Sequence, residues 1–190
     1  MRYPTDMMMR AFFLLTFTFA LQLATTSVAQ VHWLTWEEAQ AKNQVEPRKI
    51  IVDVYTQWCG WCKKMDKATF EDPAISAYIN KNYYAVKFDA QTKTDITFKG
   101  KVYKYVKQGE SGFNELANEI LFGRMSFPTI VFFDEKLNLI QPLQGYKDPE
   151  SMNKIMKYFT ENYYKTTPWK KYEGMCPSAT PNATVPIKKD

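Results

Sequence analysis

Residues 51–63 read IVDVYTQWCGWCK and place two cysteines, Cys59 and Cys62, directly after a run of β-branched residues. Residues 50–55 are typical of a buried strand, with one acid, Asp53, in its middle. Residues 57–60 predict a turn, and we expect a helix from about residue 59 to residue 70. The segment therefore predicts a cysteine pair in the first turn of a helix that follows a buried strand.

A cysteine in that position is activated by its surroundings. The sulfur of Cys59 is expected near helix N–H groups that lack partners and near the positive end of the helix dipole. Both stabilise a thiolate, so we expect a lowered pKa of Cys59 and a role as nucleophile. Cys62 lies one turn further along, and we expect it to be more buried and to act as the resolving thiol that releases a mixed disulfide from Cys59.

Other uses of a C-x-x-C pair are open at this point. Haem attachment needs a following His, and Lys63 stands there instead. A zinc site needs about four ligands, whereas Cys176 and His32 are the remaining strong ligands and lie far away in the sequence. A purely structural disulfide is a further alternative, although so short a ring constrains little unfolded-chain entropy. We expect neither a metal nor a cofactor.

The rest of the chain alternates between helical and strand patterns. Further strands are expected over residues 83–89, 129–134 and 139–143, and a hairpin over 96–105. Further helices are expected over residues 35–43, 72–81, 113–122 and 148–164. This order predicts an α/β fold with a central mixed sheet and helices on both faces.

Composition narrows the classes of function. The chain has 190 residues, a formal net charge of +5 and 16% aromatic residues, which suits one globular domain. Its 25 Lys and Arg are interspersed with 20 Asp and Glu, so a nucleic-acid partner is not expected. Three cysteines are too few for a disulfide scaffold, and a single histidine argues against the usual Ser-His-Asp enzymes.

Both ends of the chain differ from its centre. Arg2 and Arg10 precede an apolar run over 11–24 that is short for a bilayer-spanning helix, and Ala29 ends a small-residue cleavage pattern. We expect residues 1–29 to be a signal peptide, with an uncleaved anchor as the alternative, and residues 30–165 to be the domain. Residues 166–190 hold four of the ten prolines and are expected to form a loosely ordered tail, with Cys176 as a spare thiol or, alternatively, a resolving or dimer-forming one.

Two segments carry a family resemblance. Residues 51–63 resemble the active-site strand and helix of thioredoxins, and residues 125–133, MSFPTIVFF, resemble the thioredoxin segment that carries the cis-proline. The continuation KKMDKATFEDP over 63–73 is similar to the C-terminal domains of membrane thiol–disulfide interchange reductases and to small secreted bacterial thioredoxin-like proteins. The resemblance covers roughly residues 35–164 and implies a thioredoxin fold. Trp61 replaces the proline of ordinary thioredoxins, and residues 92–112 form an insertion that contains the hairpin.

The resemblance implies roles for three further residues. Asp53 matches the family's buried acid, whose raised pKa lets it take a proton from Cys62; an acid ending at a strand edge is the alternative. Lys87 matches the lysine that pairs near that acid, or is a solvated side chain. Pro128 is expected to be cis, which exposes the Phe127 backbone to an extended substrate; a trans-proline loop is the alternative.

Aromatic residues surround the expected site. Trp58, Trp61 and Phe127 are expected to form an apolar rim around Cys59 that binds an extended peptide, with ordinary packing as the alternative. The remaining residues expected at the substrate site are Gly60 and Thr129.

The expected function is a secreted, periplasmic thiol–disulfide oxidoreductase that exchanges electrons between Cys59–Cys62 and protein thiols or disulfides and needs an upstream redox partner. The dipeptide Gly60-Trp61 lacks the histidine that oxidising members of the fold often carry between their cysteines, which favours the reductase direction. An oxidase or disulfide isomerase and a non-catalytic binding module are the alternatives. No stable membrane insertion is expected after signal cleavage.

Overall fold

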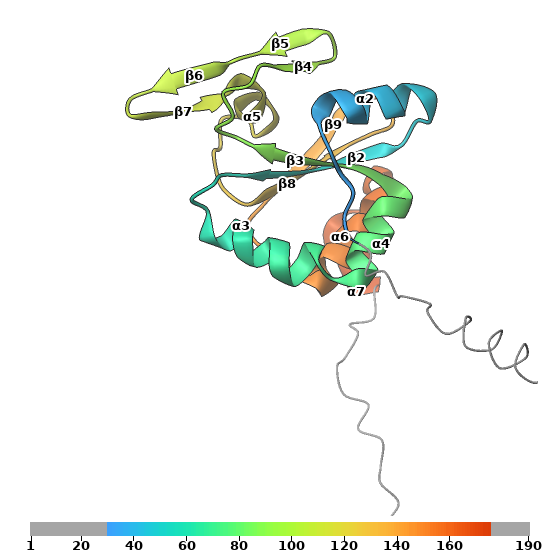
Figure 1. The fold of residues 1–190 in the computed structure, drawn as a ribbon. Coiled ribbons are helices and arrows are strands. Elements are labelled where there is room, and N and C mark those ends of the chain that lie inside the picture. The colour runs from blue at the N-terminus through green and yellow to red at the C-terminus, as the bar shows by residue number, and fades with distance from the viewer. Residues whose placement is uncertain (1–29, 176–190) are drawn as a thin grey trace, which may run out of the picture.

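The computed structural model describes residues 30–175; the expected signal peptide and Cys176 lie outside the described residues. Its centre is a five-stranded mixed sheet in the order β1-β3-β2-β8-β9 (Figure 1). The strands are β1 (Trp33–Leu34), β2 (Lys49–Tyr55), β3 (Tyr83–Asp89), β8 (Thr129–Phe133) and β9 (Leu139–Gln144). Strand β2 pairs in parallel with β3 and antiparallel with β8, so the expected mixed sheet and thioredoxin fold are confirmed.

Helices cover both faces of this sheet (Figure 1). One face carries α2 (Trp36–Val45) and α5 (Glu115–Ile120), and the other carries α3 (Gly60–Met65), α4 (Pro73–Asn82) and α6 (Pro149–Thr160). Three of these helices begin directly after a residue whose side chain caps the helix N-terminus. Thr35 and Glu38 form a capping box before α2, and the carboxylates of Asp72 and Asp148 accept backbone N–H groups of α4 and α6.

Each face of the sheet has its own hydrophobic core. On the α2 face, Trp36 is 2% exposed and lies edge-on to the rings of Phe88 and Phe133. On the other face, Phe132 stacks on Phe159 of α6 with ring centroids 4.2 Å apart. The central strands are therefore buried on both sides, which explains the continuous apolar run in β2.

The insertion contains two hairpins instead of the expected one. Strands β4 (Ile96–Phe98) and β5 (Lys101–Tyr103) form the first, and β6 (Tyr105–Gln108) and β7 (Ser111–Asn114) form the second. The expected helix over 113–122 was wrong at its start, because Asn114 ends β7 and caps α5 by accepting the N–H of Leu116. Strand β6 of the second hairpin is mostly exposed and has no alternating apolar pattern, so no period-two signal marked this hairpin.

The ordered domain continues beyond residue 165, so the expected tail was wrong over its first part. A 3-10 turn (Tyr163–Lys165) leads into α7 (Trp169–Met175), where Tyr172 is 4% exposed. The rings of Trp169 and Tyr172 pack on Tyr158 of α6. Aromatic residues one helical turn apart therefore hold this short helix against the domain.

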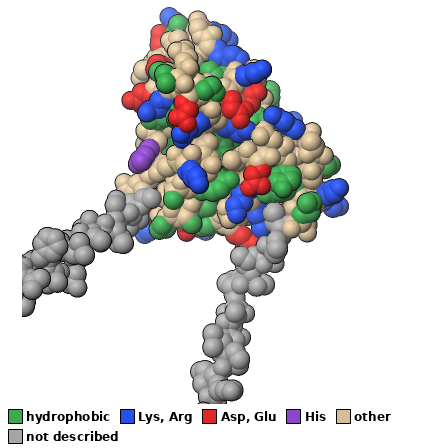
Figure 2. Space-filling model, turned by 90° about the vertical axis from the view of Figure 1, so that its right-hand side faces the viewer, with side chains coloured by type: hydrophobic (Ala, Val, Ile, Leu, Met, Phe, Trp, Pro, Cys, Tyr) green, Lys and Arg blue, Asp and Glu red, His purple; other side chains and the backbone are tan. Residues whose placement is uncertain are grey.

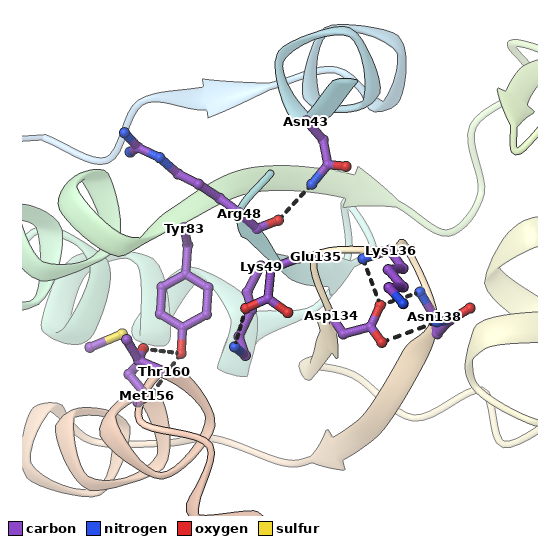
Figure 3. A network of polar contacts seen from close by, with 10 residues as sticks. All are labelled: Asn43, Arg48, Lys49, Tyr83, Asp134, Glu135, Lys136, Asn138, Met156 and Thr160. Carbon is purple, nitrogen blue, oxygen red and sulfur yellow. Dashed lines mark hydrogen bonds and ion pairs between the residues drawn. The ribbon is translucent and has the colours of Figure 1, made fainter. Parts of the chain in front are cut away.

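Polar contacts close the end of the sheet at which β2 begins (Figure 3). Lys49 is 4% exposed and pairs with Glu135 at 2.5 Å, while the Tyr83 hydroxyl donates to the carbonyl of Met156.

On the face that Figure 2 shows, basic and acidic side chains are intermixed. Within residues 30–175, no helix is both long and apolar enough to span a bilayer.

Candidate active site

The cysteine pair lies at the N-terminal end of α3 and is closed as a disulfide. The two sulfurs are 2.12 Å apart and the two Cα atoms 5.3 Å apart. Cys59 is the N-cap residue, and its Sγ accepts the N–H of Cys62 at 3.1 Å. Cys59 is 4% exposed and Cys62 is 1% exposed, so Cys62 is slightly the more buried of the two. After reduction, the Cys59 sulfur at this position faces helix N–H groups, which favours its thiolate.

The end of strand β2 determines where this helix starts. The N–H of Cys59 donates to the carbonyl of Thr56, which directly follows β2 and is buried. Gln57 and Trp58 form the exposed turn between them. The buried strand thus holds the start of α3, and with it the disulfide, at the carboxyl end of the central strand of the sheet.

A buried acid and a lysine lie side by side in the neighbouring strands. Asp53 of β2 is in register with Lys87 of β3, and the Lys87 Nζ is 2.5 Å from Asp53 Oδ2. Asp53 is fully buried, and its Oδ1 has no hydrogen-bond partner among the described residues. Burial raises the pKa of Asp53 to about 6, against the opposing effect of Lys87. The expected pairing of Lys87 is therefore present.

A second acid, Asp66, also binds Lys87 and was missed by the sequence analysis. Asp66 lies in the π-helical turn (Asp66–Phe70) that continues α3. Burial by itself lowers the pKa of Lys87, but the carboxylates of Asp53 and Asp66 outweigh this effect and raise it. Asp66 follows Cys62 by four residues, so helical spacing alone was enough to place it on the same face.

Aromatic rings enclose the same ammonium group. The Lys87 Nζ lies 5.2 Å from the ring centroid of Trp33, 4.9 Å from that of Tyr55 and 5.5 Å from that of Phe70. These contacts stabilise the charged amine in a partly buried place. Trp33 belongs to the short strand β1, which the sequence analysis did not predict.

The proline segment, residues 125–133, meets the cysteine segment, residues 51–63, at the end of the sheet where the disulfide lies. The Phe127–Pro128 peptide is cis, as expected, and the Pro128 carbonyl accepts the N–H of Gly145 at 2.8 Å. The ring of Phe127 lies edge-on to Trp58, with centroids 6.0 Å apart. Two segments about 70 residues apart in the chain thus share one surface.

The aromatic rim is exposed and held by residues that the sequence analysis missed. Trp58 is 68% exposed and its indole N–H donates to Gln91 Oε1 at 2.8 Å. Trp61 is 57% exposed and its ring lies 5.7 Å from that of Tyr146. Gly60 is exposed, and a Cβ added there would meet no atom within 4 Å. The space beside the start of α3 is therefore open.

Thr129, which was expected at the substrate site, does not present its side chain at the surface. Its side chain is fully buried, and its hydroxyl donates to the carbonyl of Ser126 at 2.7 Å. Thr129 is the first residue of β8 and pairs with Val54 in the middle of the sheet, which turns it away from the surface. Its hydroxyl instead binds the backbone of the loop that carries Pro128.

Reversible thiol–disulfide exchange is the class of chemistry that this fold and its cysteine pair support. Within residues 30–175, no group of three or more His, Cys, Asp or Glu is placed to hold a metal ion. Residues 36–160 match the family described as "Thioredoxin-like domain". The chain belongs to this thioredoxin-like family.

Individual relatives are distant. "Uncharacterized protein B0495.5" of Caenorhabditis elegans is 25% identical over 144 residues, which are 74% of this chain and 17% of that protein. The thiol:disulfide interchange protein DsbD of Haemophilus influenzae is 26% identical over 124 residues, 64% of this chain and 18% of that protein. The solved structure of the DsbH oxidoreductase shares the fold, with a TM-score of 0.52 and 16% identity over 74% of this chain and 92% of that chain. This chain spans less than a fifth of both curated relatives.

Proposed function

We propose that this chain is an exported thiol–disulfide oxidoreductase that reduces disulfides of other proteins in a periplasmic compartment. The observation that carries the proposal is the Cys59–Cys62 disulfide at the start of α3. The signal-peptide pattern of residues 1–29 supports export. The likeness to an interchange protein, DsbD, supports the type of reaction.

The reduced form carries out two consecutive exchanges. The Cys59 thiolate attacks one sulfur of the target disulfide, forms a mixed disulfide and releases the other target sulfur as a thiolate. Cys62 then transfers its proton to Asp53 and attacks the Cys59 sulfur. This step closes the Cys59–Cys62 disulfide and releases the second target thiolate. Two electrons have passed to the target, and an upstream dithiol protein must return them to this chain.

The residues between the cysteines support the reductase direction. Strongly oxidising pairs have an unusually stabilised thiolate, which makes their reduced form the favoured one. Gly60 and Trp61 carry no titratable group and therefore add no positive charge beside Cys59. Helix N–H groups remain as the principal stabilisation of the thiolate.

The reduction potential of residues 30–190, equilibrated against glutathione buffers, is expected near about −270 mV. A value near about −120 mV would contradict the reductase and support the oxidase or isomerase alternative. If the pair does not cycle at all, the structural-disulfide and binding-module alternatives replace the proposal. A Cys176→Ser variant measured in parallel controls for the third thiol of the chain.

A further inference from the structure

The two exposed tryptophans beside Cys59 lie in different electrostatic surroundings. Trp58 donates its indole N–H to the neutral side chain of Gln91. Beside Trp61, in contrast, the Nζ of Lys64 lies 4.7 Å from the Trp61 ring centroid and 5.3 Å from that of Tyr146. The Trp61 side of the site therefore presents a cation held against two aromatic rings.

The ammonium of Lys64 has no carboxylate counterion among the residues that the structure describes. Within residues 30–175, no carboxylate forms an ion pair with Lys64 or with Arg124. Two nearby acids have other partners. Asp66 forms an ion pair with Lys87, and Asp148 caps α6 by accepting the N–H of Ser151. Uncompensated cations beside a binding site favour an anionic partner.

A hollow of about 470 Å³ lies beside the proline loop. Phe122, Arg124, Leu143 and Lys147 belong to its lining. Phe122 is 68% exposed, which is unusual for a large apolar side chain. The Lys147 Nζ already donates to the backbone carbonyls of Gln144 and Gly145, so Arg124 supplies the unengaged cation. The hollow thus combines an apolar contact with a site for a carboxylate.

Residues 144–147 join the hollow to the disulfide end of the sheet. Gln144 and Lys147 line the hollow, and Gly145 donates its N–H to the Pro128 carbonyl. Tyr146, between them, contacts the Trp61 ring. The hollow and the Trp61 side are therefore connected through one short segment, residues 144–147. Together they form the cationic docking surface, which consists of Trp61, Lys64, Tyr146, Phe122, Arg124 and Lys147.

We propose that the cationic docking surface binds an acidic segment of the protein with which Cys59 exchanges its disulfide. The inference rests on the proposed function and names the class of its partner: a polypeptide with Asp or Glu close to the reacting cysteine. The carboxylates of this segment face Lys64 and Arg124, and one of its apolar side chains packs on Phe122 in the hollow. Charge complementarity of this kind raises the association rate and selects the partner.

Two synthetic peptides test the proposal. Each carries one cysteine in disulfide linkage with 2-mercaptoethanol, and they differ only in having glutamates or lysines around that cysteine. The reduced protein is expected to reduce the glutamate peptide with a kcat/KM higher by at least about tenfold at about 20 mM salt. The preference is expected to fall below about threefold at about 0.5 M salt, because the Debye length shortens.

A charge-reversal pair locates the effect. The double variant Lys64→Glu/Arg124→Glu is expected to abolish or invert the preference, whereas Lys42→Glu/Lys81→Glu, with the same charge change at the opposite end of the sheet, is expected to retain it. The ratio of kcat/KM between the two peptides is compared within each variant, so a change in the reactivity of the Cys59 thiol cancels. Two results would overturn the docking surface alone: equal rates of the wild type for both peptides, or an equal loss of the glutamate preference in both double variants. No reduction of either peptide would overturn the proposed function and the docking surface with it.

Discussion

Replacement of Cys59 by serine is expected to abolish disulfide exchange, with a fall in kcat/KM of at least about 10⁴-fold. A serine hydroxyl is not ionised at neutral pH and forms no disulfide, so the first step of the reaction has no nucleophile. Cys62 does not replace it, because Cys62 lies inside α3 and lacks the N-cap position that brings the Cys59 sulfur against helix N–H groups. Reduction of a protein disulfide by the reduced variant, followed by thiol release, is the measurement.

The matched control is Cys62→Ala. It retains the Cys59 nucleophile but lacks the thiol that resolves the mixed disulfide. We expect this variant to accumulate a covalent complex with its target, visible on a non-reducing gel and absent with Cys59→Ser. If Cys59→Ser keeps measurable turnover, Cys59 is not the nucleophile of the reaction. If the variant still binds targets with wild-type affinity and the wild type shows no turnover, the chain is a binding module.

Replacement of Asp53 by asparagine is expected to stabilise the oxidised protein by about 3 kcal/mol at about pH 7.5. Burial raises the pKa of Asp53 to about 6, so ionisation of this carboxyl is opposed in the folded state. Asparagine has no charge to bury, and Lys87 keeps Asp66 as its partner. The free energy of unfolding in urea, compared between wild type and variant, measures the effect.

The pH dependence gives the sign of this effect. Between about pH 4 and about pH 6 the folded wild type binds more protons at Asp53 than the unfolded chain. Its stability therefore falls as the pH rises through this window. The variant lacks this fall, so its advantage is expected to vanish below about pH 4 and to be complete above about pH 6. A variant that is less stable than the wild type at pH 7.5 would contradict the expectation.

The same substitution separates stability from activity. Without a proton acceptor for Cys62, release of the mixed disulfide is expected to slow by roughly tenfold or more, although the protein is more stable. Asp95→Asn is the control, because Asp95 is an exposed acid 3.9 Å from Lys104 at the surface. It is expected to change neither quantity.

Local patterns in the sequence were sufficient for much of the fold. The strand before Cys59, the helix after it and the capping residues Thr35, Asp72 and Asp148 all act through neighbours within about four residues. The cis peptide before Pro128 came from family resemblance and agrees with the structure. The missed elements, β1, the β6–β7 hairpin and α7, are short and carry little periodic signal.

The partners of the site residues were harder to predict. Gln91 lies 33 residues from Trp58, and Tyr146 lies much further from Trp61, so no local rule pairs them. The burial of the Thr129 side chain was not predicted either, since only the register of β8 against β2 determines which way this side chain points.

The sequence by itself determined the chemical groups of this protein: a cysteine pair at a helix start, an acid in the preceding strand and a proline segment to meet them. These depend on spacing and on hydrogen bonds within one or two turns of chain. Only the tertiary structure decided further parts of their environment, namely the second carboxylate, Asp66, on Lys87 and the ammonium of Lys64 beside the Trp61 ring. Burial and charge are sums over neighbours from many strands and helices, so they exist only once the chain has packed.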